Sequence, residues 1–361
     1  MMPSNNLAVL SCAGSGKTSE IVKMAASTPS GRSLLLTYTR NNAQEIRTRF
    51  YKTKGFIPAN CDVITWYSFL LSHWVRPYQR QYRALRIDEI AWINGKSAIG
   101  IPKSNPSRYF FSPQGRIYRD KIAEFGVACD AASGGKVIKR LAQIYSTIYI
   151  DEFQDLTAWD LDIVELLLRS GIRTVIVGDH RQHILRTNDG PKYKKYRGEG
   201  ILKRIDSWKG QGICKIENRN DNRRSCQTIC DLADYVFPHS ANMVSVSVGA
   251  TGHDGVFVIN SSAVSAYYAT FSPAILRWDK RTECHGYGAM NFGESKGLGF
   301  DRVLIYPNGP IRKFLSQNDK GAISNARAKL YVGVTRARYS VAFVLDGTCT
   351  VPGIRLYHLM S

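Results

Sequence analysis

The chain has 361 residues, of which 44% are hydrophobic and 11% aromatic, so it is long enough for two or three domains and can bury a sizeable core. This composition excludes wholesale disorder. Lys and Arg number 49 against 29 Asp and Glu, which gives a formal net charge of +20. Such an excess indicates an anionic partner, with nucleic acid as the first expectation and a membrane surface as the second.

The sequence predicts neither a membrane span nor a secretory signal. No run of about 18 apolar residues occurs, and no basic segment followed by a long apolar stretch opens the chain. The eight cysteines are scattered, without the spacing typical of zinc sites or redox motifs. We therefore expect buried, reduced thiols in a cytoplasmic protein that is not secreted.

Buried strands alternate with helices in the first part of the chain. The expected strands are 7–12, 33–38, 62–65, 146–151 and 172–179, and the expected helices include 17–26 and 41–51. This alternation predicts a parallel sheet covered on both faces. It breaks between residues 76 and 146, where a basic, aromatic-rich stretch is interpreted as an inserted, mainly helical subdomain.

The strand–helix rhythm resumes after about residue 210. Strands are expected at 212–217, 256–259, 302–306 and 340–345, with a helix at 224–236. We therefore predict an α/β protein of two domains, with a first domain at 1–210 that carries the insertion at about 76–146, and a second domain at 211–361.

The segment SCAGSGKT (residues 11–18) follows a strand and opens a helix, as a phosphate-binding P-loop requires. Glycine allows the backbone N–H groups of such a turn to point inward, and the helix N-terminus adds partial positive charge. Lys17 is expected to reach the β- and γ-phosphates, and Thr18 to ligate Mg²⁺. The other expected nucleotide-binding residues of this loop are Ala13, Gly14, Ser15 and Gly16.

A second half-site follows another buried strand, in TIYIDEFQD (147–155). Asp151 is expected to hold Mg²⁺ through water, and Glu152 to polarise the attacking water as general base. The two half-sites together predict hydrolysis of a nucleoside triphosphate, with ATP, other nucleotides of that type, and Mg²⁺ as the expected ligands.

Seven segments resemble, in order, the motifs of UvrD/Rep-like superfamily 1 DNA helicases. They are TYTRNNAQEIRTRF (37–50), TWYSF (65–69), DEFQD (151–155), VGDHRQHI (177–184), NRRS (222–225), NFGESKGLGFDRVLI (291–305) and KLYVGVTRAR (329–338). The resemblance implies two RecA-like P-loop NTPase domains, with ATP in the cleft between them and single-stranded DNA across their top.

The resemblance also implies residue roles. Gln182 would sense the γ-phosphate and couple it to DNA. Arg224 and Arg336, from the second domain, would neutralise charge that develops during hydrolysis. The expected function is an NTP-dependent translocase or helicase that moves 3′ to 5′ on single-stranded DNA.

Three departures from the family concern the base and the sugar. Only about six residues precede the first strand, so the family's glutamine-containing adenine reader is not expected. Arg223 stands in place of the stacking tyrosine of the family's NYRS segment, and Gly299 in place of the ribose-binding glutamate of KGLEF. We therefore predict weak discrimination among nucleotides, with Arg223 stacking on the base.

Residues 76–146 and 180–224 each hold 13 Lys or Arg against 5 Asp or Glu, so both regions are expected to face nucleic acid. Thr39 and Arg40 are candidates for nucleotide as well as nucleic-acid contact. For Tyr196, a solvated basic loop is the alternative to base stacking. The other nucleic-acid candidates are Thr37, Trp66, Tyr67, Ser68, Asn291 and Lys296.

Only 65 residues (226–290) separate the NRRS segment from the KGLGF segment, too few for the family's large accessory domain. The resemblance thus implies a minimal motor that binds single-stranded DNA or a single-strand/duplex junction. The alternative is a DNA-binding NTPase subunit of a nuclease, recombination or defence complex that does not unwind on its own. RNA is a third possible substrate.

Overall fold

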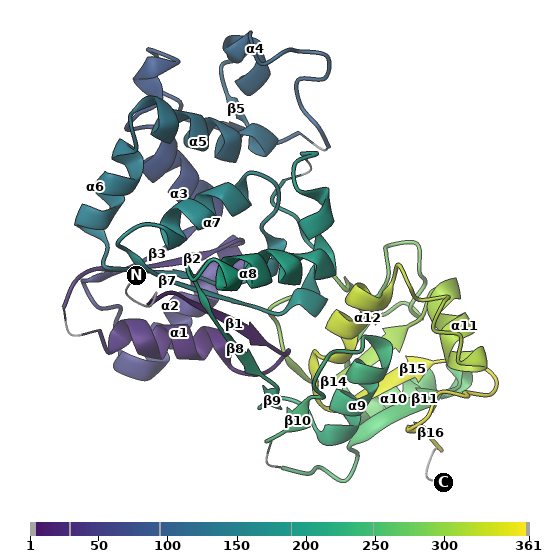
Figure 1. The fold of residues 1–361 in the computed structure, drawn as a ribbon. Coiled ribbons are helices and arrows are strands. Elements are labelled where there is room, and N and C mark those ends of the chain that lie inside the picture. Colours follow the sequence, from purple (N-terminus) through teal and green to yellow (C-terminus); the bar gives the residue numbers. More distant parts are fainter. Residues whose placement is uncertain (1–4, 29, 94, 189, 248, 359–361) are drawn as a thin grey trace. The chain divides into compact units, whose positions relative to one another are not determined.

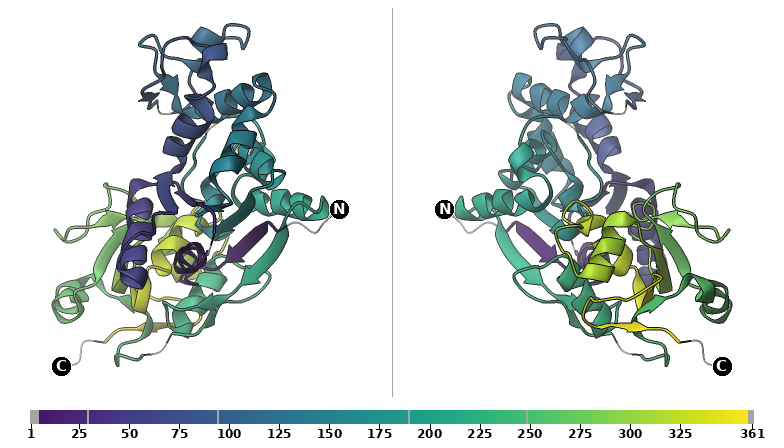
Figure 2. Two further views of the ribbon diagram at one scale, coloured as in Figure 1. Left: turned by 90° about the vertical axis from the view of Figure 1, so that its left-hand side faces the viewer. Right: turned by 90° about the vertical axis from the view of Figure 1, so that its right-hand side faces the viewer.

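The computed structural model describes residues 5–28, 30–93, 95–188, 190–247 and 249–358. Its helices and strands form two compact units (Figure 1, with turned views in Figure 2). The first unit comprises the residues up to Leu10 together with Lys17–Asn218, and the second comprises Ser11–Gly16 together with the chain from Arg219 onwards. Each unit is built on one six-stranded sheet.

The sheet of the first unit has the strand order β3-β2-β6-β7-β1-β8. The strands are β1 (Leu7–Ser11), β2 (Ser33–Thr37), β3 (Cys61–Thr65), β6 (Thr147–Ile150), β7 (Arg173–Gly178) and β8 (Lys215–Arg219). The four pairings from β3 through β2, β6 and β7 to β1 are parallel. Every residue of β2 and β6 is buried, as in a strand that is covered on both faces.

The helices of the first unit lie on both faces of this sheet, with α1 and α2 on one face and α3, α5 and α7 on the other (Figure 1). The α-helices are α1 (Lys17–Ala26), α2 (Arg40–Lys54), α3 (Trp66–Phe69), α4 (Pro106–Phe110), α5 (Ile122–Ala132), α6 (Lys136–Ile144), α7 (Asp160–Leu168) and α8 (Ile201–Gly210). The shorter elements are the π-helix η1 (Leu70–Val75), the 3₁₀ turns η2 (Gln79–Gln81), η3 (Arg119–Lys121), η4 (Phe153–Asp155), η5 (His180–Gln182), η6 (Lys194–Tyr196) and η7 (Gly198–Gly200), and the paired strands β4 (Ile90–Ala91) and β5 (Ile117–Tyr118).

Local sequence sets the ends of α2. The Thr39 side chain accepts a hydrogen bond from the Asn42 N–H at 3.1 Å and so caps the first turn. Gly55 ends the helix with a φ of 81°, and its N–H donates to Tyr51 O at 2.8 Å. Thr39 therefore has a structural task in addition to the contact expected of it.

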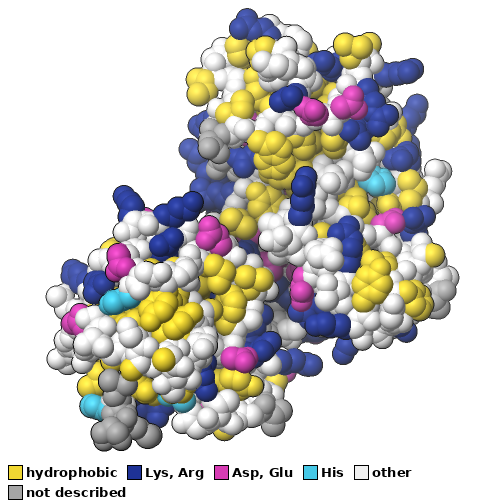
Figure 3. Space-filling model, turned by 180° about the vertical axis from the view of Figure 1, so that it is seen from behind, with side chains coloured by type: hydrophobic (Ala, Val, Ile, Leu, Met, Phe, Trp, Pro, Cys, Tyr) yellow, Lys and Arg dark blue, Asp and Glu magenta, His cyan; other side chains and the backbone are white. Residues whose placement is uncertain are grey.

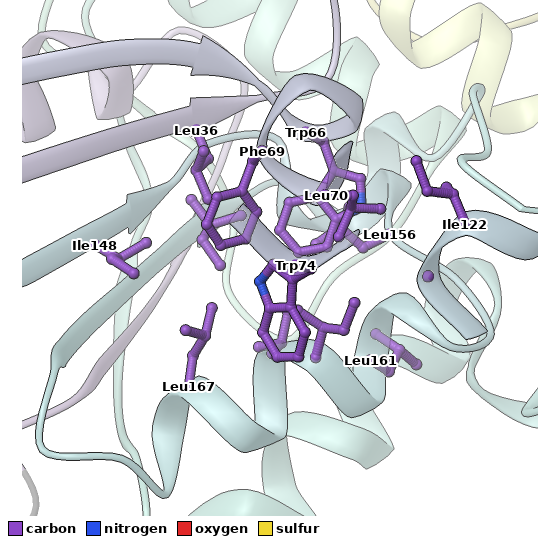
Figure 4. Close-up of a cluster of buried hydrophobic side chains, with 14 of the residues drawn as sticks. Leu36, Trp66, Phe69, Leu70, Trp74, Ile122, Ile148, Leu156, Leu161 and Leu167 are labelled. Carbon is purple, nitrogen blue, oxygen red and sulfur yellow. The ribbon is translucent and has the colours of Figure 1, made fainter. Parts of the chain in front are cut away.

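One hydrophobic core joins the sheet to the inserted segment (Figure 4). Leu36 and Ile148 project from β2 and β6 toward Phe69 of α3 and Trp74 of η1, and all four side chains are buried. Ile122 of α5 belongs to the same cluster, so the inserted helices pack on the sheet rather than around a separate core. The regular secondary structure between residues 76 and 146 is mostly helical, as predicted.

The sheet of the second unit has the strand order β13-β12-β14-β15-β11-β16, and all its pairings are parallel. The strands are β11 (Gly255–Ile259), β12 (Ala274–Arg277), β13 (Met290–Asn291), β14 (Phe300–Tyr306), β15 (Ala337–Val344) and β16 (Ile354–Leu356). The helices are α9 (Gln227–Val236), α10 (Val264–Phe271), α11 (Gly309–Gln317), α12 (Arg327–Val334) and the turn η8 (Ser261–Ala263). The short strands β9 (Asp221–Asn222) and β10 (Val244–Ser245) form a separate parallel pair.

Two parallel six-stranded sheets confirm the predicted α/β class with two RecA-like domains. One strand was placed wrongly: the apolar run at 212–217 was expected to open the second domain, but β8 is the edge strand of the first sheet, beside β1. The first unit accordingly runs to Asn218, past the boundary expected after residue 210.

Six of the eight cysteines are buried. In the part of the chain that the structure describes, no helix combines the length and the apolar character needed to cross a bilayer.

His253 of the second unit is held between aromatic rings. Its imidazole stacks on Phe257 and on Phe271, with ring centroids 4.2 and 4.0 Å apart, and its Nε2 shares a hydrogen bond of 3.0 Å with the Tyr267 hydroxyl. Burial, followed by the positive charges of two nearby arginines, lowers the pKa of His253 to about 4.

We expect His253 to stay neutral until the pH falls to about 4. A histidine in the unfolded chain binds its proton near a pH of about 6.5, so between these values only the unfolded state takes up a proton, and His253 lowers the stability as the pH falls. An NMR titration of the imidazole protons measures this midpoint, and a His253→Gln variant assigns the signal. A midpoint near the ordinary histidine value would contradict the buried stacking.

Candidate nucleotide and nucleic-acid sites

Four predicted residues meet at the carboxyl end of the first sheet. Asp151 and Glu152 directly follow β6, at the edge where the ends of parallel strands converge. The Thr18 hydroxyl donates to Asp151 Oδ2 at 2.8 Å, and Lys17 Nζ lies 3.5 Å from Glu152 Oε1. Both members of the lysine–glutamate pair are nearly buried. The structure thus brings the start of α1 together with the acidic pair.

Glu152 has a strained backbone. Its φ is 55°, in the left-handed region that a non-glycine residue adopts only at some expense in free energy. Its carboxylate accepts a hydrogen bond from Gln154 Nε2, and Gln154 Oε1 in turn accepts from the Asp179 N–H at 3.1 Å. Gly178 leaves room for this link, because a Cβ there would lie 2.4 Å from Gln154 Oε1. Gln154 thereby connects the end of β6 to the end of β7.

Gln182, the expected γ-phosphate sensor, lies on the same network. It is buried, and its Nε2 donates to Asp179 Oδ2 at 2.9 Å. Burial alone would raise the pKa of Asp179, but the positive charges of Arg181, His180 and Lys17 outweigh it and lower that pKa. Asp179 therefore stays ionised and orients Gln182. The sequence analysis missed Asp179 and Gln154, although both lie inside motifs that it quoted.

The electrostatics of Asp151 suit a divalent cation. Burial, followed by the negative charge of Glu152, raises the pKa of Asp151 to about 6. The Thr18 hydroxyl and the Asp151 carboxylate are hard oxygen donors of the kind that Mg²⁺ prefers. Their separation of 2.8 Å brings both oxygens within reach of one ion, so these two residues fit the metal role that was predicted for them.

The loop at residues 11–16 groups with the second unit. The Ala13 N–H donates to the Tyr331 hydroxyl at 3.2 Å, and Asn222 Nδ2 donates to Ala13 O at 2.9 Å. Gly14 has a φ of 75°, and a Cβ there would lie 2.7 Å from Asn222 Oδ1. Both the backbone conformation and the lack of space therefore favour glycine at this position. Ser15 Oγ is buried and has no hydrogen-bond partner in the described part of the chain. An unsatisfied buried hydroxyl in this loop fits a phosphate oxygen as its missing partner.

The three predicted arginines all belong to the second unit. The Arg223 side chain is exposed, and its backbone N–H donates to Gly14 O at 2.9 Å. Arg224 Nη1 donates to Thr335 O at 3.0 Å. Arg336 is buried, and its Nε donates to Val332 O, also at 3.0 Å. Backbone carbonyls at the end of α12 thus orient two of the three guanidinium groups.

The structure contradicts the nucleic-acid contact expected of Trp66, and Thr37 is buried as well. Trp66 is only 1% exposed, and its indole Nε1 donates to the buried Asp160 Oδ1 at 2.7 Å. An indole packed in the core in this way cannot stack on a base. Thr37 is also buried, at the end of β2, and its Oγ1 has no partner among the described residues.

Other residues of the same segments line a pocket of about 460 Å³. Its aromatic walls are Tyr38, Tyr67 and Trp92, with centroids 5.9 Å apart for Tyr38–Tyr67 and 5.2 Å apart for Tyr67–Trp92. Trp92 comes from the inserted segment and is 65% exposed, so it is the ring best placed to meet a base. The remaining lining residues are Thr39, Arg40, Thr65, Ser68, Leu71, Asp88, Ile90 and Leu185.

Three predicted contacts lie outside this pocket. Tyr196 is half-buried in η6. Its ring centroid lies 5.5 Å from that of Tyr193 and 5.4 Å from the guanidinium carbon of Arg204. In the second unit, the Asn291 N–H donates to a carboxylate oxygen of Glu294 at 2.8 Å, and Lys296 is largely buried. Trp92 was not predicted from the sequence, because it lies outside every motif and its exposure is visible only in the structure.

The family comparison matches residues 126–189 to the UvrD/REP helicase N-terminal domain. This range contains Asp151, Glu152 and Gln182. Over this segment, the resemblance to UvrD/Rep-like helicases is confirmed. The matched segment is therefore of the helicase type, and its motifs lie where the first sheet ends.

Solved structures that match the chain include the PRRSV helicase, with a TM-score of 0.46 and 13% identity, covering 94% of this chain and 52% of that one. Arterivirus nonstructural protein 10 (helicase) has a TM-score of 0.48 and 13% identity, and covers 94% and 59%. Its complex with DNA has a TM-score of 0.48 and 14% identity, and covers 94% and 60%. The chain thus spans little more than half the length of these proteins. No curated protein matches it.

The two tryptophans give a matched pair of variants. Trp92→Ala should weaken binding of a single-stranded oligonucleotide by about 5- to 150-fold, since stacking on one base contributes about 1–3 kcal/mol. Trp66→Phe should leave that affinity unchanged but lower the stability by about 1–3 kcal/mol, because Asp160 loses a buried donor. Fluorescence anisotropy and urea unfolding measure the two effects. A fall in affinity for Trp66→Phe with none for Trp92→Ala would reverse the assignment.

Proposed function

We propose that the protein is an NTP-dependent translocase or helicase that hydrolyses ATP and moves 3′ to 5′ on single-stranded DNA. The observation that carries this proposal is the joining of Lys17 and Thr18 to Asp151 and Glu152 at the end of the first sheet. The match of residues 126–189 to a helicase-type domain supports it.

In the proposed reaction, Lys17 binds the β- and γ-phosphates, and the loop at 13–16 binds phosphate oxygens through its N–H groups and the Ser15 hydroxyl. Thr18 and Asp151 would hold Mg²⁺, whose chemistry when bound is to neutralise charge on the phosphates. Glu152 accepts the proton of the attacking water, and the bond from Gln154 keeps its carboxylate directed.

The residues that couple hydrolysis to movement come from both units. Gln182, held by ionised Asp179, responds to the presence of the γ-phosphate. Arg224 and Arg336 of the second unit supply positive charge to the transition state. We propose that the aromatic pocket of Tyr38 and Trp92 receives a base of the single strand.

The first experiment is steady-state NTP hydrolysis with and without single-stranded DNA, duplex DNA and single-stranded RNA. Glu152→Gln should lower the stimulated rate by about 10²- to 10⁴-fold while nucleotide binding is retained, since the substitution removes the general base and little volume. Lys17→Ala should lose turnover and nucleotide affinity together, and keep its affinity for DNA.

Each outcome of this assay has a clear meaning. Wild-type turnover in Glu152→Gln would contradict the role of Glu152. Stimulation by single-stranded DNA, with strand separation in an unwinding assay, supports the motor. Turnover without separation, restored by a partner, would favour the alternative of an NTPase subunit in a nuclease or recombination complex.

The nucleotide base is proposed to be read weakly. Arg223 and Gly299 replace the family's base-stacking and ribose-binding side chains, and Gly299 offers neither a hydrogen-bond donor nor an acceptor from a side chain. Comparable kcat/KM values for ATP, GTP and CTP are expected, and Arg223→Ala should raise KM for all three alike. A strict preference for ATP would overturn this expectation.

A further inference from the structure

The inserted segment contains a second cavity, of about 570 Å³, that shares no lining residue with the aromatic pocket. Its polar lining includes Arg83, Arg108, Ser112 and Gln114. Phe111 supplies an apolar wall. A cavity of this volume is large enough for a group the size of a nucleotide.

Arg83 is fixed at this cavity by its neighbours. Its guanidinium carbon lies 4.8 Å from the centroid of the Phe111 ring. Gly115, with a φ of 77°, lets the guanidinium lie against the turn, because a Cβ there would come within 2.4 Å of Arg83 Nη2. Arg83 Nε is buried and has no hydrogen-bond partner among the described residues. The guanidinium therefore lies against the ring and the turn, with hydrogen-bonding capacity left over.

The five acidic residues between positions 76 and 146 have partners other than Arg83 and Arg108. They are Asp88, which pairs with Arg76 and Arg86, Glu89 with Arg116, Asp120 with Ser97, Glu124 with Lys103, and Asp130 with the N–H groups of Val137 and Ile138. In the described part of the chain, no carboxylate forms an ion pair with Arg83 or Arg108. Two guanidinium groups thus face one cavity without a protein anion to balance them.

We propose that this cavity binds one nucleotide of a single strand, as a nucleic-acid site additional to the aromatic pocket. The planar guanidinium groups of Arg83 and Arg108 match the geometry of phosphate oxygens. One face of the Arg83 guanidinium lies on the Phe111 ring, and the opposite face offers a surface on which a base can stack. A duplex presents its phosphates on a convex surface, whereas a cavity accepts an unstacked nucleotide, so the geometry favours a single strand.

The surroundings of the cavity agree with a polyanionic ligand. The stretch of residues 76–146 carries 13 Lys or Arg against 5 Asp or Glu. Figure 3 shows Lys and Arg side chains around the top of the molecule, in the part that holds α4 and β5 in Figure 1. This inference rests on the proposed function, since it extends the path of the single strand over the inserted segment.

The test compares two double variants that each remove two positive charges. Arg83→Gln/Arg108→Gln alters the cavity, whereas Arg80→Gln/Lys139→Gln alters exposed cations of the same segment that do not line it. Fluorescence anisotropy measures the binding of oligothymidylates of increasing length, and of a duplex, over a series of salt concentrations. Thermal unfolding shows that both variants are folded, and hydrolysis without nucleic acid should equal that of the wild type in both.

For the cavity variant, the slope of log K against log salt should fall by about 0.7 to 1.4, according to whether the two arginines hold one phosphate or two. The loss should appear only with strands beyond a threshold length, and the duplex affinity should stay unchanged. An equal loss in the control variant, or an equal loss for duplex, would overturn the proposal.

Failure of the inference can be told from failure of the proposed function. If the wild type binds single strands and is stimulated by them, but the cavity variant behaves identically, only the second site is refuted. If the wild type neither binds single strands nor responds to them, the proposed function and the second site are refuted together.

Discussion

The buried electrostatic interaction of Lys17 with two adjacent carboxylates determines the charge balance at the end of the first sheet. Asp151 and Glu152 are both buried, and burial, followed by their weakly screened mutual repulsion, raises the pKa of Asp151. The ammonium group of Lys17 and the hydroxyl of Thr18 are what oppose it. A site with this surplus of negative charge is unfavourable for folding alone, and it becomes favourable when a cation binds.

The backbone around that site follows from the burial of β6. A strand covered on both faces has no room to turn until it leaves the sheet, and the chain then turns sharply at Glu152, in the left-handed region. Gln154 can reach across to β7 only because Gly178 carries no side chain. Hydrogen bonds through Gln154 to the end of β7 therefore stabilise the strained backbone at Glu152. The position of the Glu152 carboxylate thus depends on both β6 and β7.

The grouping of the candidate phosphate-site residues could be predicted because each half of the group is local in sequence. Lys17 and Thr18 follow a glycine turn, and Asp151 and Glu152 follow an apolar strand, so strand ends alone brought them together. The sequence could not distinguish aromatic residues that are exposed from those that are buried in the core. Trp66 lies in a motif, yet Asp160, nearly a hundred positions away, provides the acceptor that keeps its indole in the core, whereas Trp92, outside every motif, stands exposed. The edge strand β8 was misplaced for a similar reason, because pairing with β1 leaves no local signal.

Aromatic rings lie against some of the cations that give the chain its net charge of +20. Lys121 Nζ lies 4.0 Å from the centroid of the Tyr109 ring, and Lys195 Nζ lies 5.0 Å from that of Tyr196. An aromatic face attracts a cation through its quadrupole, but leaves the charge of the cation intact. A carboxylate in the same place would stabilise the cation and cancel its field. A cation placed on a ring is therefore stabilised locally and still contributes to a positive potential to which a polyanion can bind.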